Sequence, residues 1–317
     1  MADNEKILVI KLGALGDFIQ ALGPMAAIKK HHPKAHITIL TTKPFESFAK
    51  DCGYFDDVWI DARPKLLNIS GWVSLKKKLN GGNFTRVYDL QNNDRTGFYY
   101  KLFNPKPEWS GIAKGASHRN TAPDRSAGHA FDGHLQTLAL AGIENIKPDP
   151  LEWMIDDITS FNLKSPYILL VPGCAPEHPY KRWPSEHYAS LANMLAKDGF
   201  QPVLLGTQSE SDATGTIAKT CPEALDLTGQ TSLKHIVTLA RHGAGAIGND
   251  TGPIHLIGST GTPCLVLFSG HSNPVRHAPK GEHVNTLQEN DLKDLKPETV
   301  FENFKPQRKL RKENINS

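Results

Sequence analysis

The sequence lacks any run of apolar residues long enough to cross a membrane. Its 317 residues are 39% hydrophobic and 22% charged, which is the balance of a soluble globular protein. No segment approaches the roughly 18 consecutive apolar residues of a spanning helix. The charged opening, residues 1–6, leads directly into an apolar run and is not typical of a secretory signal. We therefore expect a cytoplasmic protein.

Cysteine is also scarce. The four cysteines lie far apart, at Cys52, Cys174, Cys221 and Cys264, and form no C-x-x-C pair. This spacing favours reduced thiols over a disulfide framework or a zinc site. The sequence also has no Asp-x-Asp motif of the kind that holds a metal ion in some transferases. We expect neither a metal nor a cofactor.

Two nucleotide-binding signatures are missing as well. The glycine-rich turn at residues 13–17 is neither G-x-G-x-x-G nor a Walker A loop, which disfavours a nicotinamide dehydrogenase and a P-loop enzyme. A net charge of +3 is too small for a surface that tracks nucleic-acid phosphates. The charge is unevenly shared, because residues 1–150 contain 20 Lys and Arg against 15 Asp and Glu, a net of +5. The first half is therefore expected to face the more anionic partner.

What the sequence does contain is a regular alternation of strand-like and helix-like segments. The alternation runs over residues 6–90, and it restarts at residue 167 and continues to 268. It predicts helices at 18–30 and 185–197 and a strand at 167–171, and residues 133–142 predict a further helix. Such a pattern predicts an α/β protein with two doubly wound, Rossmann-like domains facing a central cleft. We place one domain at 1–160, a second at 161–290, and a C-terminal helix and tail at 291–317 that packs back on the first domain.

Polar turns at the carboxyl ends of the predicted strands are the candidate site. Residues 249–255 (NDTGPIH) follow an apolar run and precede a helical one, so free N–H groups of the helix could bind a phosphate. A capped helix with a half-buried histidine explains the same residues. The phosphate-site candidates from this motif are Asp250, Thr251, Gly252, Pro253 and His255.

The other candidates carry alternatives of their own. Lys181 precedes a helix, where a cation is disfavoured and calls for an anionic partner such as a phosphate. Arg182 could make that contact instead, while Trp183 is more typical of packing. Glu210 could bind ribose hydroxyls or cap a helix, and Asp17 could be catalytic or only a cap. Gly173 and Cys174 form a tight turn after a strand.

Five sets of residues, in this order along the chain, resemble the bacterial lipopolysaccharide heptosyltransferases. They are residues 11–24 (KLGALGDFIQALGP), 89–91 (DLQ), 172–173 with 181–184 (PG and KRWP), 227–233 (LTGQTSL) and 249–255. One departure is residues 268–272 (FSGHS), where many relatives have Tyr-Gly-Pro-Thr/Ser. The resemblance implies a GT-B fold and inverting transfer of heptose from ADP-heptose to an inner-core acceptor, the ADP-sugar being a substrate.

The resemblance also assigns roles. It implies that domain 1–160 is the acceptor-side domain and that domain 161–290 binds the nucleotide sugar. Asp17 would be the base that takes the acceptor proton, and Lys181 would stabilise the leaving diphosphate. The candidates named above between residues 173 and 255, together with Thr231, form the donor-side set. Acceptor-side candidates are Gly13 and Gln91, and the basic loops add Arg63, Lys65 and Arg119. A solvated helix face explains the neighbouring Lys76, Lys77 and Lys78.

Three classes of function stay open. The first is a heptosyltransferase, the second a transferase or epimerase of the same architecture with another nucleotide sugar, and the third a non-catalytic nucleotide-sugar-binding module. The expected partners are a nucleotide-sugar donor and an anionic glycolipid acceptor, without nucleic acid. Peripheral contact of the basic half with the inner membrane is a further expectation.

Overall fold

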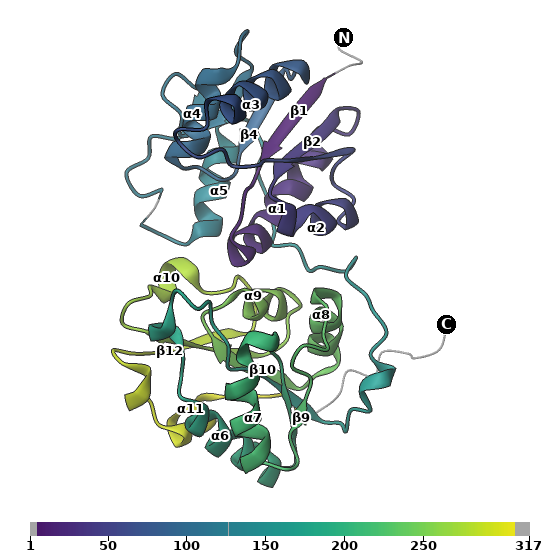
Figure 1. Cartoon of the computed structure of the whole chain (residues 1–317), viewed down its shortest axis with the longest axis vertical. Helices are drawn as coiled ribbons and strands as arrows, with labels where there is room; N and C mark the ends of the chain where they lie inside the picture. Colours follow the sequence, from purple (N-terminus) through teal and green to yellow (C-terminus); the bar gives the residue numbers. More distant parts are fainter. Residues whose placement is uncertain (1–4, 126, 308–317) are drawn as a thin grey trace. The chain divides into compact units, whose positions relative to one another are not determined.

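The computed structural model describes residues 5–125 and 127–307. Within them the chain divides into two compact units, Met1–Asp149 and Pro150–Ser317, which Figure 1 shows coloured along the sequence. None of the helices in the described ranges combines the length and the apolar character needed to cross a membrane. The boundary falls eleven residues before the predicted one, because the connecting segment at 150–158 bonds to the second unit, through Arg241 to the carbonyls of Leu151 and Met154.

Unit 1 is a six-stranded parallel sheet with strand order β3-β2-β1-β4-β5-β6. This is the Rossmann order, in which the order of strand addition reverses between β1 and β4. We call this position the strand reversal. Its strands and helices are β1 (Lys6–Ile10), α1 (Leu15–His31), β2 (His36–Thr41), α2 (Glu46–Asp51), β3 (Asp57–Ile60), α3 (Ile69–Gly81), β4 (Arg86–Asp89), α4 (Asp94–Leu102), β5 (Glu108–Gly111), β6 (His118–Arg119) and α5 (Ala130–Ala139), with a short 3-10 turn at Lys43–Phe45.

Unit 2 repeats the same order in a second parallel sheet, β12-β11-β10-β7-β8-β9. Its reversal lies between β7 and β10. Its elements are β7 (Tyr167–Val171), α6 (Ser185–Lys197), β8 (Gln201–Leu204), α7 (Ser211–Thr220), β9 (Leu225–Asp226), α8 (Leu233–His242), β10 (Gly245–Asn249), α9 (Gly252–Ser259), β11 (Cys264–Ser269), α10 (Pro274–His277), β12 (Val284–Glu289) and α11 (Pro297–Asn303), with 3-10 turns at Thr159–Phe161, Pro179–Lys181, Gln208–Glu210 and Leu292–Asp294.

The central strands form because both of their faces are covered. Residues 7–10 of β1 and 167–171 of β7 are buried throughout, as their unbroken apolar runs predict. Each sheet is the centre of its own core, with Trp109 and Tyr99 among the buried side chains of unit 1 and Trp183 and Tyr188 among those of unit 2. The predicted pair of doubly wound α/β domains is confirmed, while a cleft shared between them stays a prediction.

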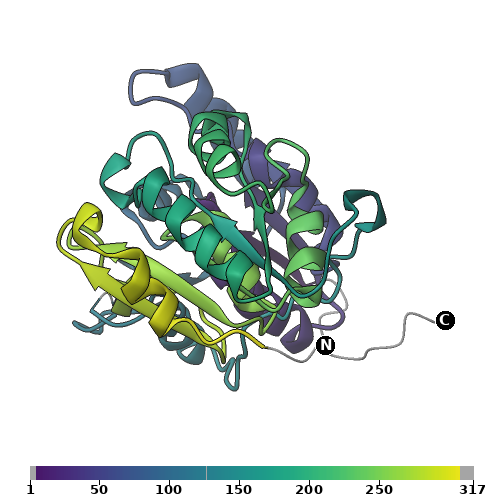
Figure 2. The same cartoon turned by 90° about the horizontal axis from the view of Figure 1, so that it is seen from below.

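The predicted position of the C-terminal segment is wrong for its described part, residues 291–307. Leu292, Leu295, Val300 and Phe304 belong to the core of unit 2, and Trp183 Nε1 donates to the carbonyl of Leu295 at 2.9 Å. Figure 2 shows this yellow segment beside the elements of unit 2. These four apolar side chains need a core, and they find it in unit 2, where α11 packs against α6. Residues 308–317 lie outside the described ranges.

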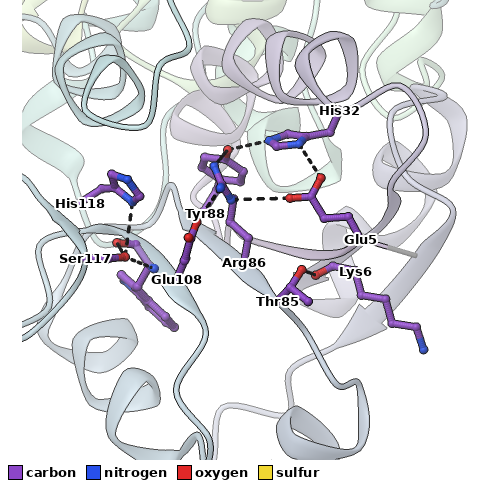
Figure 3. Close-up of polar contacts among 10 residues, drawn as sticks. Glu5, Lys6, His32, Thr85, Arg86, Tyr88, Glu108, Ser117 and His118 are labelled. Atoms are coloured by element: carbon purple, nitrogen blue, oxygen red, sulfur yellow. Dashed lines mark hydrogen bonds and ion pairs between the residues drawn. The ribbon is translucent and has the colours of Figure 1, made fainter. Parts of the chain in front are cut away.

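The amino edge of the first sheet carries a chain of polar contacts (Figure 3). His32, just after α1, is 2.9 Å through Nδ1 from Glu5 and 2.7 Å through Nε2 from the Tyr88 hydroxyl. Arg86 donates to the same hydroxyl at 3.3 Å and pairs with Glu108. Burial outweighs Glu5 and lowers the pKa of His32. The network ties the beginnings of three parallel strands together and leaves their carboxyl edge free to build a site.

Candidate active site

In unit 1 the turn after β1 is held open by its neighbours. Gln91 Oε1 accepts from the backbone N–H of Leu12 at 2.8 Å, and Thr42 Oγ1 donates to the Leu12 carbonyl at 3.1 Å. Gly13 has φ +117°, and a Cβ there would lie 2.6 Å from the ring of Phe45. Only glycine satisfies both the angle and the space. Gly13 and Gln91, two predicted acceptor-side residues, therefore shape one turn at the strand reversal.

Asp17 lies in the first turn of α1 and is half-buried. The helix begins at Leu15 with Ala14 as its N-cap, and no side chain bonds to that cap among the described residues. Asp17 is thus three residues inside the helix and is not its N-cap. The first-turn position still allows a helix-dipole role for this carboxylate, so a catalytic role for Asp17 stays a prediction.

Buried charges lie directly beneath this turn. Lys11, 4% exposed, donates from Nζ to the carbonyl of Leu90 at 3.1 Å. Burial lowers the pKa of Lys11, and the carboxylates of Asp17 and Asp89 oppose that shift. Burial raises the pKa of Asp89 to about 6, although its Oδ1 accepts the N–H groups of Gln91 and Asn92. Burial also lowers the pKa of His134 well below its usual value, with Lys11 adding to the effect.

The basic acceptor-side candidates flank this centre from both ends of the sheet. Arg63 and Lys65 follow β3, one edge strand, whereas Arg119 ends β6, the opposite edge strand. All three side chains are exposed. Arg63 adopts φ +48° and its N–H donates to Asp61, while Arg119 Nε donates to the Ile112 carbonyl. The structure therefore brings Gly13, Gln91 and Asp17 together but holds the basic loops apart from one another.

In unit 2 the reversal between β7 and β10 is organised by one amide. Asn249 is fully buried, and its Nδ2 donates to the carbonyls of Pro172 at 2.8 Å and Gly173 at 3.2 Å. Its Oδ1 accepts from the Trp183 N–H at 3.3 Å and the Tyr188 hydroxyl at 3.0 Å. Asn249 thus fixes both the turn after β7 and the entry to α6. Trp183 is fully buried, so its predicted packing role is confirmed.

Lys181 has a protein partner. Its Nζ lies 2.6 Å from Oδ2 of Asp250, which also accepts from the Ser272 hydroxyl at 2.6 Å. The prediction that Lys181 needs an anion is met here by a carboxylate, and Asp250 does not cap α9. The lysine side chain keeps 21% exposure against 5% for the aspartate. Asp250 therefore holds the ammonium group in place while part of it still faces solvent.

The start of α9 has no side-chain cap among the described residues, although Pro253 has no N–H group and the N–H of Ile254 donates to the Thr251 carbonyl. Thr251 is the N-cap, but within the described residues its hydroxyl makes no capping hydrogen bond. Gly252 and Pro253 form the first turn and are half-buried, whereas His255 in the same helix is buried. Thr251 is therefore the N-cap by position only, Asp250 bonds elsewhere, and an anion at this helix terminus stays a prediction.

The remaining donor-side candidates border the neighbouring turns. Glu210 accepts from the N–H and hydroxyl of Thr207 at 2.8 and 2.6 Å, so it does cap the following turn. A Cβ at Gly173 would lie 2.7 Å from that glutamate. The Cys174 thiol is buried and donates to the His178 carbonyl. Arg182 is exposed, and Thr231 is half-buried just before α8. A ribose contact of Glu210 stays a prediction.

Sequence reasoning missed several residues of these two turns. Ser272 falls in the segment that departs from the family pattern, yet it bonds to Asp250. Lys11 and Asp89 were part of recognised motifs but had no assigned role, and His134 had no signal at all, because a histidine in a helix is buried or exposed only through its neighbours. Within each unit separately, the order of the strands brings these residues to their partners.

Comparisons with known proteins agree with this arrangement. The model of glycosyltransferase family 9 (heptosyltransferase) matches residues 146–305. Lipopolysaccharide heptosyltransferase 2 of Escherichia coli K12 is 33% identical over 295 residues, which covers 85% of this chain and 84% of the relative. The solved ADP-heptose lps heptosyltransferase II of E. coli superposes with a TM-score of 0.71 at 22% identity, over 94% of this chain and 96% of the other.

A second solved structure, the E. coli heptosyltransferase WaaC with ADP-2-deoxy-2-fluoro heptose, has a TM-score of 0.72 at 16% identity, over 94% of this chain and 98% of that one. At such low identities these two structures establish a shared fold, of the GT-B type. The matched relative and the family model carry the assignment further. The chain belongs to glycosyltransferase family 9, the heptosyltransferases, and is a glycosyltransferase.

Proposed function

We propose that this chain transfers heptose from ADP-heptose to the inner core of lipopolysaccharide, with inversion at the anomeric carbon. The observation that carries the proposal is the paired turn in unit 2. There Lys181, held by Asp250, and the uncapped start of α9 offer positive charge from two elements at one strand reversal. A leaving diphosphate needs that charge. The family names of the relatives supply the sugar and the acceptor class.

The chemistry is a single displacement. An acceptor hydroxyl attacks the anomeric carbon, a new C–O bond forms, and the bond to the diphosphate breaks with its electron pair going to ADP. The hydroxyl proton passes to the Asp17 carboxylate. Lys181 and the N–H groups at the start of α9 offset the charge on the departing ADP. We assign no step to a metal ion or a cofactor.

The acceptor side of the proposal rests on unit 1. It is supported by the bond from the Leu12 N–H to Gln91, next to Gly13 in the turn that leads into the helix of Asp17, and by the exposed side chains of Arg63, Lys65 and Arg119 on the two edge strands of the sheet. Phosphate and carboxylate groups of an anionic glycolipid would bind such cations. Because that acceptor is anchored in lipid, we also propose that the chain works in peripheral contact with a membrane.

The donor half is tested by nucleotide-dependent melting of the whole chain. ADP at about 100 times its Kd should raise Tm by roughly 5 °C or more, because a ligand that binds only the native state stabilises it. UDP and GDP should give smaller shifts. Lys181→Ala should reduce the ADP shift, whereas Lys197→Ala, at the other end of α6, should not. No shift with any nucleotide would contradict the donor site.

The reaction itself is tested with ADP-heptose and a heptose-free inner-core acceptor. Formation of a heptosylated product with release of ADP supports the proposal. Transfer from UDP- or GDP-linked sugars in preference to ADP-heptose would point to a different donor, and ADP binding without any transfer would point to a binding module.

A further inference from the structure

Unit 1 exposes a compact group of large apolar side chains. Leu66 is 86% exposed, Leu67 91%, Ile69 76% and Val73 61%. They lie within eight residues, in the loop after β3 and the first turns of α3. Isolated exposed apolar residues are ordinary, but a contiguous group marks an interaction surface. We call residues 63–77 the β3–α3 segment.

The segment is not loosely held. Trp72 Nε1 donates to the Lys65 carbonyl at 3.1 Å, and its ring meets that of Phe98 edge-on at 5.1 Å. Arg95 on α4 lies 5.6 Å from the same ring and donates to the Pro64 carbonyl. Figure 1 shows α3 and α4 side by side. The backbone is therefore anchored from below while the four aliphatic side chains point away from the core.

The outward face of α3 is also basic. Positions 69, 73, 76 and 77 share one helical face, so Lys76 and Lys77 continue the line of Ile69 and Val73, whereas Leu75 and Leu79 are buried. All four outward positions are exposed. Between Asp61 and Asp89 the sequence contains no Asp or Glu. The segment thus combines exposed aliphatic side chains with cations and no nearby acid in the chain.

That combination matches the surface of an anionic bilayer. Aliphatic side chains are stabilised when they enter the acyl boundary, and lysine ammonium groups at the same depth bind lipid phosphates. We propose that the β3–α3 segment docks unit 1 onto an anionic membrane, with Leu66, Leu67, Ile69 and Val73 inserted and Lys76 and Lys77 at the headgroups. The biological reason for docking rests on the proposed function, because Arg63 and Lys65, the candidate acceptor contacts, begin the same segment.

Co-sedimentation with vesicles that contain no acceptor tests docking apart from catalysis. The full chain should bind phosphatidylcholine vesicles that include phosphatidylglycerol and bind pure phosphatidylcholine vesicles less. The double variant Leu66→Ser, Leu67→Ser should bind about tenfold more weakly or worse, because serine lacks the favourable transfer free energy of each leucine side chain from water to the acyl region. The matched control Ile155→Ser, Val275→Ser removes two exposed apolar side chains of unit 2 and should bind as the wild type does.

The electrostatic half has its own pair of variants. Lys76→Gln, Lys77→Gln should weaken binding to the anionic vesicles by roughly tenfold and make it less sensitive to salt. Lys197→Gln, Lys219→Gln, two exposed lysines of unit 2, should change neither. Equal binding by wild type and both segment variants would overturn the proposal, as would wild-type binding that ignores both salt and lipid charge.

Two further outcomes separate the alternatives. If the segment instead joins two copies of this chain, light scattering will show a dimer that Leu66→Ser, Leu67→Ser dissociates, and the docking proposal falls. Transfer to a delipidated, water-soluble acceptor should be unchanged in that variant, while transfer to an acceptor embedded in vesicles should drop. Vesicle binding without any heptose transfer would uphold docking and reject the proposed function.

Discussion

The two strand reversals, β1/β4 in unit 1 and β7/β10 in unit 2, have the same topology but are stabilised differently. In unit 2 a neutral amide, Asn249, makes four hydrogen bonds to the surrounding residues, and the Lys181–Asp250 ion pair is partly exposed. In unit 1 the equivalent position holds the buried charges of Lys11 and Asp89. The reversal in unit 2 is fixed by the hydrogen bonds of the uncharged Asn249, which we call the neutral cradle. In unit 1 the charges of Lys11 and Asp89 lie below Asp17 instead.

The difference fits the work that we propose for each. A diphosphate brings its own charge, so its site needs fixed donors and a cation that can exchange a carboxylate for a phosphate. A general base accepts its proton from a neutral hydroxyl, which brings no charge to the site. The charges that influence the base must therefore come from neighbouring protein side chains. On the roles that we propose, one fold would be adapted to a donor or to an acceptor by changing a few side chains at the reversal.

The largest expected effect is at the base. Asp17→Ala should lower kcat by about 10²–10⁴-fold, the usual contribution of a general base, while the ADP-induced rise in Tm persists. Glu298→Ala, which removes another first-turn acid, at α11, should leave kcat unchanged. Turnover of Asp17→Ala at the wild-type rate would end the assignment and the contrast between the two reversals.

The next effect concerns the neutral cradle. Asn249→Ala should cost about 3 kcal/mol of unfolding free energy, because it leaves buried carbonyls and a buried hydroxyl without partners. The loss should be the same at pH 5 and pH 8, since the amide does not titrate. Denaturant titration at both pH values measures it. A cost that changes strongly with pH would mean that charge also supports this reversal.

The smallest effect concerns the buried charge in unit 1. The Asp89 carboxyl ionises near pH 3.8 when unfolded and has a folded pKa of about 6, so the unfolded state releases its proton first as the pH rises. The contribution of Asp89 to stability therefore falls between about pH 4 and pH 6 and stays low above that.

Removing that charge should cancel the fall. Relative to the wild type, Asp89→Asn should gain about 2 kcal/mol of unfolding free energy between pH 4 and pH 7, as followed by denaturant titration. Asp226→Asn controls for the loss of one charge, because Asp226 makes a similar strand-end hydrogen bond from a half-buried position. A flat difference between Asp89→Asn and wild type would show that Asp89 is not an energetic burden at neutral pH.

Local pattern was sufficient for most of the fold. Helix 185–197 and strand 167–171 were predicted with the observed bounds, because their periodicities are long and unambiguous. The predicted helices at 18–30 and 133–142 each began three residues late, since α1 begins within the glycine turn and α5 begins at Ala130 after the His129 cap. Short edge strands such as β6 had too few residues to show a period.

The sequence by itself determined which residue types stand at the ends of the strands, and hence the two nucleotide-fold units and the candidate groups Asp17, Lys181 and Asn249 to His255. Only the tertiary structure decided which of these side chains bond to one another. Lys181 and Asp250 are 69 residues apart, and Gln91 and Leu12 are 79 apart. Such contacts depend on the order of strands in the sheet, which no local pattern encodes, because hydrophobic periodicity places a side chain on a face but does not name its neighbour.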